Sequence, residues 1–328
     1  MSSTMQVDTL AEKIKTPTKA TFLTSVFKNG LKKKLSHLNV GCISVVDGED
    51  KFSFGDTDSD LQVNVQVHSQ EFYVMTGSGG AMGIAEAYIL GYWTSDDVVM
   101  LMRIILKNRS ILMSLDNGIA KVLSPINKLI HRSRQNTLKG SKENILAHYD
   151  LSNDFYKLWL DPTMTYSCAY FKDTNTTLED ASIEKLDRMC RKLKLSEVDN
   201  ILEVGTGWGS FSIHAAKNYG CRITTTTISD AQYEYAKSRV VEEGLESKIN
   251  VINKDYRKLD GQYDKIVSIE MIEAVGYEYI TEYFRKLSSL LMPDGLMAIQ
   301  GITYNDQNFD TYKDSVDFIK KYIFPGSC

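Results

Sequence analysis

The segment at residues 200–220 constrains the fold of this chain more than any other. A short apolar run ends in a turn that contains Gly205, Gly207 and Gly209, and a helical pattern of apolar residues follows it. Strand, glycine turn and helix in this order open a doubly wound α/β unit. Glycine has no Cβ, so the backbone of such a turn can pass close to a bound ligand. The segment predicts a ligand site where the first strand ends; a turn that only packs a helix on a strand is the alternative.

The spacing of these glycines distinguishes between two cofactors. A dinucleotide fingerprint has the pattern G-x-G-x-x-G, whereas here Ser210 stands at the third glycine position and Gly209 comes one residue early. Glu203 precedes the turn, and the resulting pattern E-x-G-x-G-x-G resembles motif I of the class I S-adenosylmethionine-dependent methyltransferases. A nearby carboxylate suits that cofactor, because it carries a cationic sulfonium and an amino-acid tail.

Strand and helix patterns alternate regularly after the turn. Strands are predicted at 221–228, 248–256, 263–271 and 295–303, with helices at 230–244 and 277–295. This alternation predicts a parallel sheet with crossover helices. Ligands of such sheets bind at the carboxyl ends of the strands, so residues after the second and third strands are expected to line the adenosine site. These residues are Thr227, Ile228, Ser229, Gln232, Asp255, Tyr256 and Arg257.

An aromatic-rich segment, HYDLSNDFYKLWLDPTMTYSCAYF, occupies residues 148–171 just before this core. Packing of a helix on the sheet explains Phe155, Leu158 and Trp159. It explains the run at 166–170 less well, because that run follows Asp161-Pro162 in a turn. Aromatic faces stabilise positive charge, either on a sulfonium or on a carbocation formed on the substrate.

Several ordered motifs resemble the cyclopropane-fatty-acyl-phospholipid synthase family, which includes the mycolic acid cyclopropane synthases. The motifs are HYDLxNDFYxxWLDPxMTYSCAYF, EVGTGWG, TTISxxQ, DYRxL, QYDKIVSIEMIEAVG, YFRKxSSLLxPDG and YIFPG. The resemblance runs from about residue 141 to residue 328, and GIAEAYILGYWTSDD at 83–97 is more weakly similar to the family's N-terminal domain. It implies an α/β, Rossmann-like methyltransferase sheet with a smaller α+β N-terminal domain.

The resemblance implies that the chain is an enzyme that transfers a methyl group from S-adenosylmethionine to a cis double bond of a phospholipid acyl chain. The product would be a cyclopropane or a methyl-branched chain, because both start from the same carbocation. An alkene is a weak nucleophile, so the enzyme must align it with the methyl group and stabilise the cation. Tyr166 and Ser167 are expected to contact the cofactor. Of Asp230 and Gln232, the resemblance favours Gln232 as the residue that holds the ribose hydroxyls.

The resemblance also implies a bound bicarbonate that removes the last proton. In the family it is held by residues that correspond to Cys168 and Glu273 and by a residue at the end of the fifth strand, often His. Here that residue is Gln300, whose amide can donate a hydrogen bond but cannot titrate, so a positioning role is expected. Glu270 is the competing carboxylate, and strand spacing allows its side chain to point the other way.

Composition bounds the remaining possibilities. The chain has 328 residues, a net charge of −4 and five cysteines without CxxC spacing. Nothing indicates nucleic-acid binding, and the lone histidines predict no metal site. The longest apolar stretch, 98–106, is too short to span a bilayer, and no signal segment precedes it, which predicts a cytoplasmic protein. The phospholipid substrate that the resemblance implies would make it associate peripherally with the membrane. Lysines at 28 and 32–34 and a basic stretch at 131–142 predict either solvated surface or contact with anionic head groups.

The expected organisation has four parts. They are a disordered tail at 1–20, an N-terminal domain at 21–125, a basic linker at 126–142 and the methyltransferase domain at 143–328. Within the N-terminal domain we expect a helix from Phe22, strands at 41–46 and 61–67, a plain turn at 77–80 and a helix at 96–107. A further helix at 178–194 is expected to cover the sheet. The oligomeric state is left open, a homodimer included.

Two other classes of function remain. One is a methyltransferase that acts on a soluble amine, since plant alkaloid N-methyltransferases resemble this family closely. The other is a non-catalytic protein that keeps the cofactor pocket. Intact Glu203, Gly205 and Cys168 argue against the second.

The family's sequence also continues beyond the segment that matches 315–328. It supplies two further strands, a helical cover, a Tyr and a Cys. The chain is therefore expected to be a C-terminally incomplete member whose fifth strand forms an apolar sheet edge. Poor solubility is expected, because an uncovered apolar edge favours aggregation. Little cyclopropanation is expected, because water would reach the carbocation.

Overall fold

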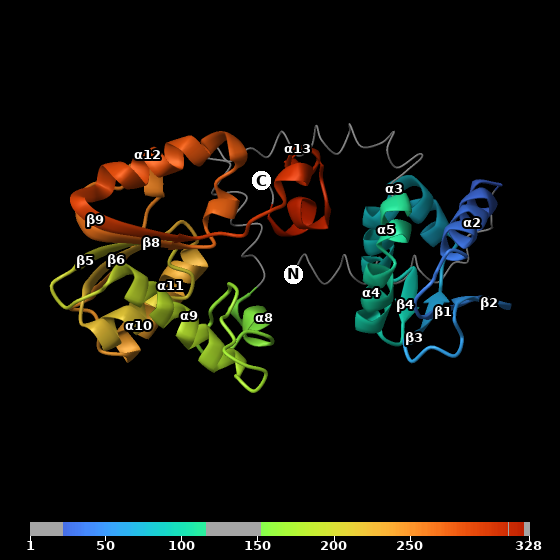
Figure 1. Cartoon of the computed structure of the whole chain (residues 1–328), viewed down its shortest axis with the longest axis horizontal. Helices are drawn as coiled ribbons and strands as arrows, with labels where there is room; N and C mark the ends of the chain where they lie inside the picture. The colour runs from blue at the N-terminus through green and yellow to red at the C-terminus, as the bar shows by residue number, and fades with distance from the viewer. Residues whose placement is uncertain (1–21, 116–151, 314, 325–328) are drawn as a thin grey trace, which may run out of the picture. The chain divides into compact units, whose positions relative to one another are not determined.

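The structure is a computed structural model that describes residues 22–115, 152–313 and 315–324 (Figure 1). The chain divides into two compact units, residues 1–129 and 130–328. The predicted tail at 1–20 and the basic linker at 126–142 lie outside the described residues. No helix among the described segments is both long and apolar enough to cross a membrane.

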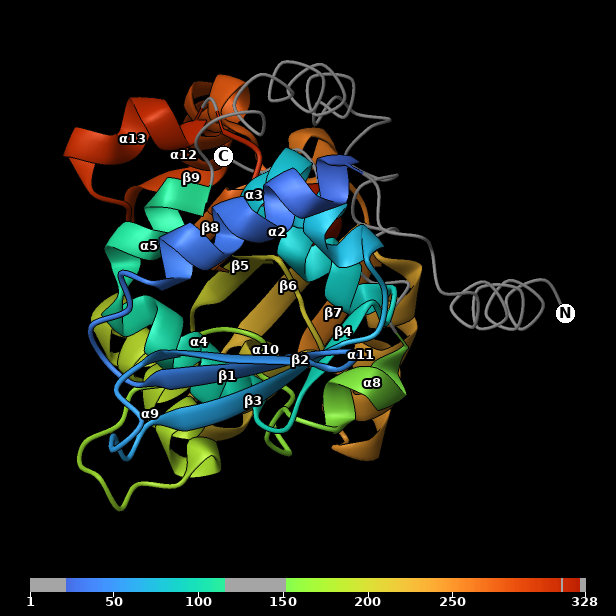
Figure 2. The same ribbon diagram turned by 90° about the vertical axis from the view of Figure 1, so that its right-hand side faces the viewer.

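The N-terminal unit is a small α+β structure. Its elements are α2 (Phe22–Leu35), β1 (Cys42–Asp47), β2 (Asp50–Gly55), β3 (Gln62–Val67), α3 (Glu71–Ile89), β4 (Trp93–Ser95), α4 (Val98–Lys107) and α5 (Arg109–Leu115). The sheet has the order β2-β1-β3-β4, in which β1 and β3 are parallel and the other pairs are antiparallel. Figure 2 shows these strands side by side, with α2 lying against α3. The predicted strands at 41–46 and 61–67 are confirmed.

The predicted turn at 77–80 is wrong, because these residues lie inside α3. A Cβ on Gly77 would meet the Phe27 ring at 2.0 Å, so glycine lets α2 approach α3 closely. Gly80 alone leaves the helical conformation, with φ 60°. Close packing between helices therefore explains Gly77, and Gly80 marks a kink within α3.

The lysines of α2 are largely engaged within their own unit. Lys28 Nζ lies 2.5 Å from a carboxylate oxygen of Asp47, Lys32 lies over the Phe52 ring, and Lys34 donates to the carbonyl of Ser114. These contacts favour the structural interpretation of the cluster over a head-group site. The second basic cluster, at 131–142, lies outside the described residues.

The C-terminal unit contains a parallel sheet covered by helices. Its larger elements are α9 (Leu178–Leu193), β5 (Asn200–Val204), α10 (Ser210–Tyr219), β6 (Arg222–Thr227), α11 (Asp230–Glu242), β7 (Ile249–Asn253), β8 (Tyr263–Ile269), α12 (Ile280–Leu290), β9 (Leu291–Gln300) and α13 (Asp306–Lys313). Short helical segments are α8 (Asn153–Lys157), η1 (Tyr256–Lys258), η2 (Ile272–Ala274), η3 (Tyr277–Tyr279) and η4 (Ile319–Ile323). The strand order is β7-β6-β5-β8-β9 and every pairing is parallel. The order reverses between β5 and β8, and such a switch point is where ligands bind in this class of sheet.

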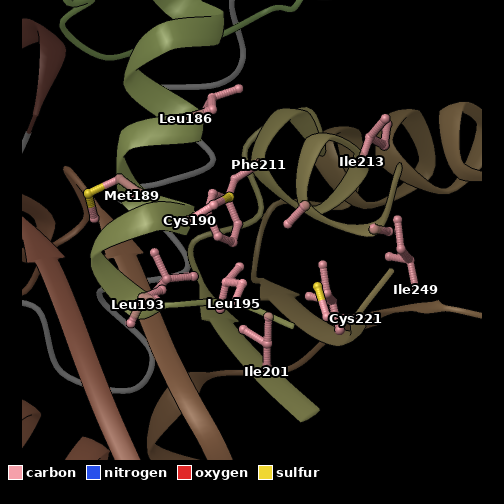
Figure 3. Close-up of a cluster of buried hydrophobic side chains, with 14 of the residues drawn as sticks. Leu186, Met189, Cys190, Leu193, Leu195, Ile201, Phe211, Ile213, Cys221 and Ile249 are labelled. Carbon is pink, nitrogen blue, oxygen red and sulfur yellow. The ribbon is translucent and has the colours of Figure 1, made fainter. Parts of the chain in front are cut away.

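Helices cover the sheet on both faces (Figure 1). On one face Leu186 and Leu193 of α9, Phe211 of α10 and Ile201 of β5 belong to one buried cluster (Figure 3). On the other face the buried residues of α12 pack on β5 and β8. The helix and strand patterns therefore place apolar residues on the expected faces, and the predicted α/β fold is confirmed.

The segment around 291–295 differs from the prediction. Here α12 ends at Leu290, and β9 begins at Leu291 and passes through Pro293 and Gly295. Proline is compatible with this course because β9 is an edge strand among the described strands. Among the strands that the structure describes, the fifth strand of the prediction therefore lies at the sheet edge.

Candidate functional site

A cavity of about 180 Å³ lies at the carboxyl ends of the parallel strands. Its walls are formed by the segments that follow four neighbouring strands, by part of the aromatic segment and by α9. The residues that contribute are Met164–Ser167, Lys185, Leu186, Glu203–Trp208, Ser210, Phe211, Thr226–Ile228, Gln232, Lys254–Arg257, Ile269–Met271, Ala274, Val275 and Phe324. The expected position at the strand ends is therefore found in the structure.

The glycine turn forms the floor of this cavity. Gly205 and Gly207 have φ values of 103° and 52°, which side chains rarely adopt. A Cβ on Gly207 would meet no atom within 4 Å, so it would project into open space. The N–H groups of Gly205 and Thr206 donate to the carbonyl of Thr226, which ties the turn to β6. Gly209 lies at the start of α10 and outside the cavity wall.

Glu203 places a carboxylate beneath the turn. Only 3% of the residue is exposed, and its Oε2 accepts hydrogen bonds from the hydroxyls of Ser212 and Thr225. Burial raises the pKa of Glu203 to about 7, although both hydroxyls act in the opposite direction. At neutral pH the group is therefore poised between its charged and neutral forms, and a cation placed nearby would favour the charged form.

Gln232 and Ser229 have separate roles at the start of α11. Gln232 lines the cavity, and its Oε1 accepts from the hydroxyl of Thr227 at 2.9 Å. Its Nε2 is buried and has no hydrogen-bond partner within the described structure. Ser229 instead caps the helix by accepting from the N–H of Gln232. An unsatisfied buried donor is costly, so a ligand acceptor here would complete the site.

The third strand end supplies Asp255, Tyr256 and Arg257. Arg257 donates through Nε and Nη2 to the two oxygens of Asp255, at 2.9 and 2.6 Å. The pair is therefore fixed by a two-point ion pair at the cavity wall. The orphaned Gln232 amide and the open space at Gly207 fit an adenosine-containing cofactor.

Tyr166 brings the aromatic segment to the same cavity. Its ring lies 5.4 Å from those of Tyr156 and Trp159 and stacks on Phe324 at 6.5 Å between centroids. Trp208 of the glycine turn joins the group and donates through Nε1 to Asn153 at 2.8 Å. Ser210 and Arg239 both donate to the carbonyl of Thr163, which anchors this segment to α10 and α11.

Lys185 is a cavity residue that the sequence interpretation missed. It lies on the buried side of α9, is only 5% exposed, and donates through Nζ to the hydroxyl of Ser167. Burial lowers its pKa to about 8, against the effect of nearby carboxylates led by Glu270. The sequence did contain an indication of this role, because Lys185 interrupts the otherwise uncharged buried stripe of α9 that contains Leu186 and Met189.

The three residues expected to hold an anion are only partly brought together. Gln300 Nε2 lies 3.2 Å from Cys168 Sγ, so these two are in contact. Glu273 Oε1 accepts instead from the N–H of Ile302, and its Oε2 is buried without a partner in the described part of the chain. None of the three belongs to the cavity wall. The wall includes Glu270, whose side chain the sequence analysis allowed to point away.

No group of three His, Cys, Asp or Glu side chains that could hold a metal ion is found in residues 22–115 or 152–324, residue 314 aside. Cys168, the one cysteine among those described that is not fully buried, has a raised pKa because of its partial burial and its contact with Glu270. Its thiol is therefore neutral at physiological pH.

Known proteins resemble this chain in sequence and fold. The model of the family described as mycolic acid cyclopropane synthetase matches residues 136–328. A tuberculostearic acid methyltransferase of Mycobacterium tuberculosis is 36% identical over 261 residues, which cover 76% of this chain and 60% of that protein. A cyclopropane-fatty-acyl-phospholipid synthase of Escherichia coli is 32% identical over 269 residues, which cover 81% of this chain and 66% of that protein. The chain thus spans less than two thirds of the length of these relatives.

Two solved structures share the fold of the C-terminal unit. The cyclopropane synthase MmaA2 from Mycobacterium tuberculosis is 32% identical, with a TM-score of 0.52. The mycolic acid cyclopropane synthase CmaA1, complexed with SAH and CTAB, is 34% identical, with a TM-score of 0.54. Each match covers 57% of this chain and 68% of the other. The fold is that of the class I S-adenosylmethionine-dependent methyltransferases, and the chain belongs to the mycolic acid cyclopropane synthetase family.

Proposed function

We propose that this chain binds S-adenosylmethionine in the cavity and methylates a cis double bond of a phospholipid acyl chain. The observation that carries the proposal is the joint placement of Glu203, the open face of Gly207 and the unpaired Gln232 amide at one sheet edge. The relatives named as a tuberculostearic acid methyltransferase and a cyclopropane-fatty-acyl-phospholipid synthase support a lipid substrate.

Different residues of the cavity would contact different parts of the cofactor. When bound, S-adenosylmethionine would supply an electrophilic methyl group. Gln232 Nε2 would donate to a ribose hydroxyl, and the Glu203 carboxylate would favour the cationic amino-acid tail. Asp255, Tyr256 and Arg257 would enclose the adenosine side. Gly207 would allow the backbone to approach the ligand.

The aromatic residues around Tyr166 would serve the substrate end. Their faces stabilise a developing positive charge on the acyl chain. They also exclude water, which would otherwise trap the carbocation. Burial and the neighbouring Glu270 raise the pKa of Tyr166, so its hydroxyl stays neutral.

Bicarbonate is the proton acceptor that the family resemblance implies, held by Cys168, Glu273 and Gln300. The donors of these residues are directed at the protein's own carboxylates. Gln300 Nε2 and the N–H of Cys168 both donate to Glu270, and Ile302 donates to Glu273. This donor set does not fit an added anion.

A phospholipid substrate would bring the chain to a membrane surface, and we propose peripheral association on that basis. The contacts of the α2 lysines within their own unit give this association no support. Co-sedimentation with unsaturated phospholipid vesicles measures it directly, and it also separates a lipid substrate from a soluble amine.

The substitution Gly207→Val tests cofactor binding. Its side chain would fill the space that the ligand needs, so we expect affinity for S-adenosylmethionine to fall by about 100-fold or more, the equivalent of about 3 kcal/mol or more. Gly244→Val is the matched control, because Gly244 also has a positive φ and open space around its Cβ position but lies outside the cavity. Calorimetric titration measures both. Equal affinity of Gly207→Val and wild type would refute the assignment.

A further inference from the structure

Glu270 has a strained backbone conformation and lies next to the switch point between β5 and β8. It follows the last residue of β8, and its φ of 47° lies in the left-handed region. Its N–H donates to the carbonyl of Gln300 at 2.8 Å, which holds the backbone there. A residue other than glycine keeps such a conformation only where the surroundings enforce it, and such positions gather at functional sites.

The side chain of Glu270 receives the donors that the resemblance assigns to bicarbonate. Gln300 Nε2 donates to Oε1 at 2.8 Å, and the N–H of Cys168 donates to the same oxygen at 3.1 Å. Both bonds end on Oε1, which leaves Oε2 outside them. Glu270 also lines the cavity beside Tyr166 and Ser167. A carboxylate is thus built into the place where an anion is expected.

The other groups near this point are poor proton acceptors. The Cys168 thiol is held neutral, because burial and Glu270 raise its pKa. Gln300 cannot titrate. Lys185 lies in the cavity as an ammonium below a pKa of about 8 and already donates to Ser167.

Glu273 is turned away from the cavity. Its Oε1 is held by the N–H of Ile302, and burial, with a contribution from the charge of Glu270, raises its pKa. A further anion placed here would meet two carboxylates, and like charges at short range repel. Glu270 is therefore the acceptor that reaches the cavity and keeps one carboxylate oxygen outside these two hydrogen bonds.

We propose that Glu270 takes the proton from the methylated acyl chain, in place of a bound bicarbonate. This inference rests on the proposed function. A C–H bond of the added methyl group breaks, and its electron pair forms the C–C bond that closes the ring on the cationic carbon. The proton passes to Oε2 and converts the carboxylate into a neutral acid, which later returns the proton to water. No oxidant or reductant is required, and Gln300 and Cys168 position the acceptor.

The first test measures anion binding and does not depend on turnover. Sodium bicarbonate is titrated into wild type and into Glu270→Gly, followed by calorimetry or by the ¹³C resonance of labelled bicarbonate. We expect no saturable binding to wild type and saturable binding to Glu270→Gly, because removal of the side chain frees both donors. Saturable binding to wild type overturns the proposal, as does the absence of binding to a Glu270→Gly protein that still binds S-adenosylmethionine.

The second test measures turnover on unsaturated phospholipid vesicles in carbonate-depleted buffer. Glu270→Gln keeps the size of the side chain and removes its charge, so we expect turnover to fall by about 10²–10⁴-fold, the usual range for loss of a general base. Affinity for S-adenosylmethionine should stay within about threefold, because the proton is removed after methyl transfer. Added formate or bicarbonate should restore part of the turnover of Glu270→Gly and leave wild type unchanged.

Exposed Glu278 supplies the matched control, since Glu278→Gln makes the same change outside the cavity. Normal turnover of Glu270→Gln, or loss of wild-type turnover on removal of bicarbonate, refutes the role of Glu270 as proton acceptor. Either result leaves the proposed methyltransferase function standing. Failure of the proposed function shows itself differently, as absent binding of S-adenosylmethionine by wild type. In that case the bicarbonate titration still decides whether Glu270 fills the anion position.

Discussion

Two neighbouring strands of the parallel sheet, β5 and β8, each bring a glutamate to the same cavity, but in contrasting surroundings. Glu203 lies within β5, is almost wholly buried, and has a pKa raised to about 7 by that burial. Glu270 follows β8, is half-buried and has a left-handed backbone conformation. Its side chain accepts hydrogen bonds from the amide of Gln300 and from the backbone N–H of Cys168. Because the two residues are of the same type, the proposed division between cofactor binding and proton transfer rests on burial and hydrogen-bond geometry.

The substitution Glu203→Gln tests whether Glu203, unlike Glu270, acts in cofactor binding. It keeps the shape of the side chain but removes the charge that a cationic ligand favours. We expect affinity for S-adenosylmethionine to fall by about 30-fold, the equivalent of about 2 kcal/mol for a hydrogen bond to a charged group. Turnover at saturating cofactor should change much less. Glu270→Gln should show the reverse pattern, and two variants with the same pattern would mean that the carboxylates share one role.

The sequence predicted the parts of the site that follow strands directly along the chain. The glycine turn, Gln232 and the residues 255–257 come straight after β5, β6 and β7, so strand prediction alone places them at one edge. The positions of Lys185 and Glu270 in the cavity wall were harder to predict from the sequence. Lys185 reaches the cavity only because α9 packs on the sheet with this side chain inward, and Glu270 does so only because its φ is positive.

The fold shows the same limit. Alternating patterns predicted the parallel sheet, because the period of apolar residues differs between strands and helices. The glycines of α3 were interpreted as a plain turn, because the packing of Gly77 against Phe27 of a different helix cannot be seen in the local sequence. Local sequence therefore fails where contacts between distant segments decide the backbone conformation.

The pH dependence of cofactor affinity should sharpen the comparison. Burial raises the pKa of Glu203 from 4.5 to about 7, so the neutral acid predominates at pH 6 and the carboxylate at pH 8. The cationic cofactor favours the carboxylate, so affinity should rise by about tenfold between these pH values, with a proton released on binding. Calorimetry in buffers of different ionisation enthalpy measures that proton. Glu203→Gln should flatten the profile, and an unchanged profile in this variant would assign the titration to another group.

In the free protein the same shift acts on stability with the opposite sign. A carboxyl whose pKa is raised on folding stabilises the folded state below pH 4.5, and this contribution is lost as pH rises through about 7. The unfolding free energy of the cofactor-free chain should therefore decline between about pH 4.5 and pH 7, and the upper part of this interval overlaps the range in which cofactor affinity increases. The two trends together identify Glu203, because Glu203→Gln should weaken both.

The smallest expected effect concerns Lys185, which influences both carboxylates. Its charge lowers the pKa of Glu203, and the charge of Glu270 in turn favours its ammonium form. In Lys185→Met the pKa of Glu203 should rise further, so the midpoint of the affinity profile should move to higher pH. At pH 7 affinity should fall by about 1.5- to twofold, as expected for a shift of a few tenths of a pKa unit. Lys192→Met, on the exposed side of α9, is the matched control and should leave the midpoint in place. A midpoint that moves to lower pH in Lys185→Met would show that the lysine does not act on Glu203 through its charge.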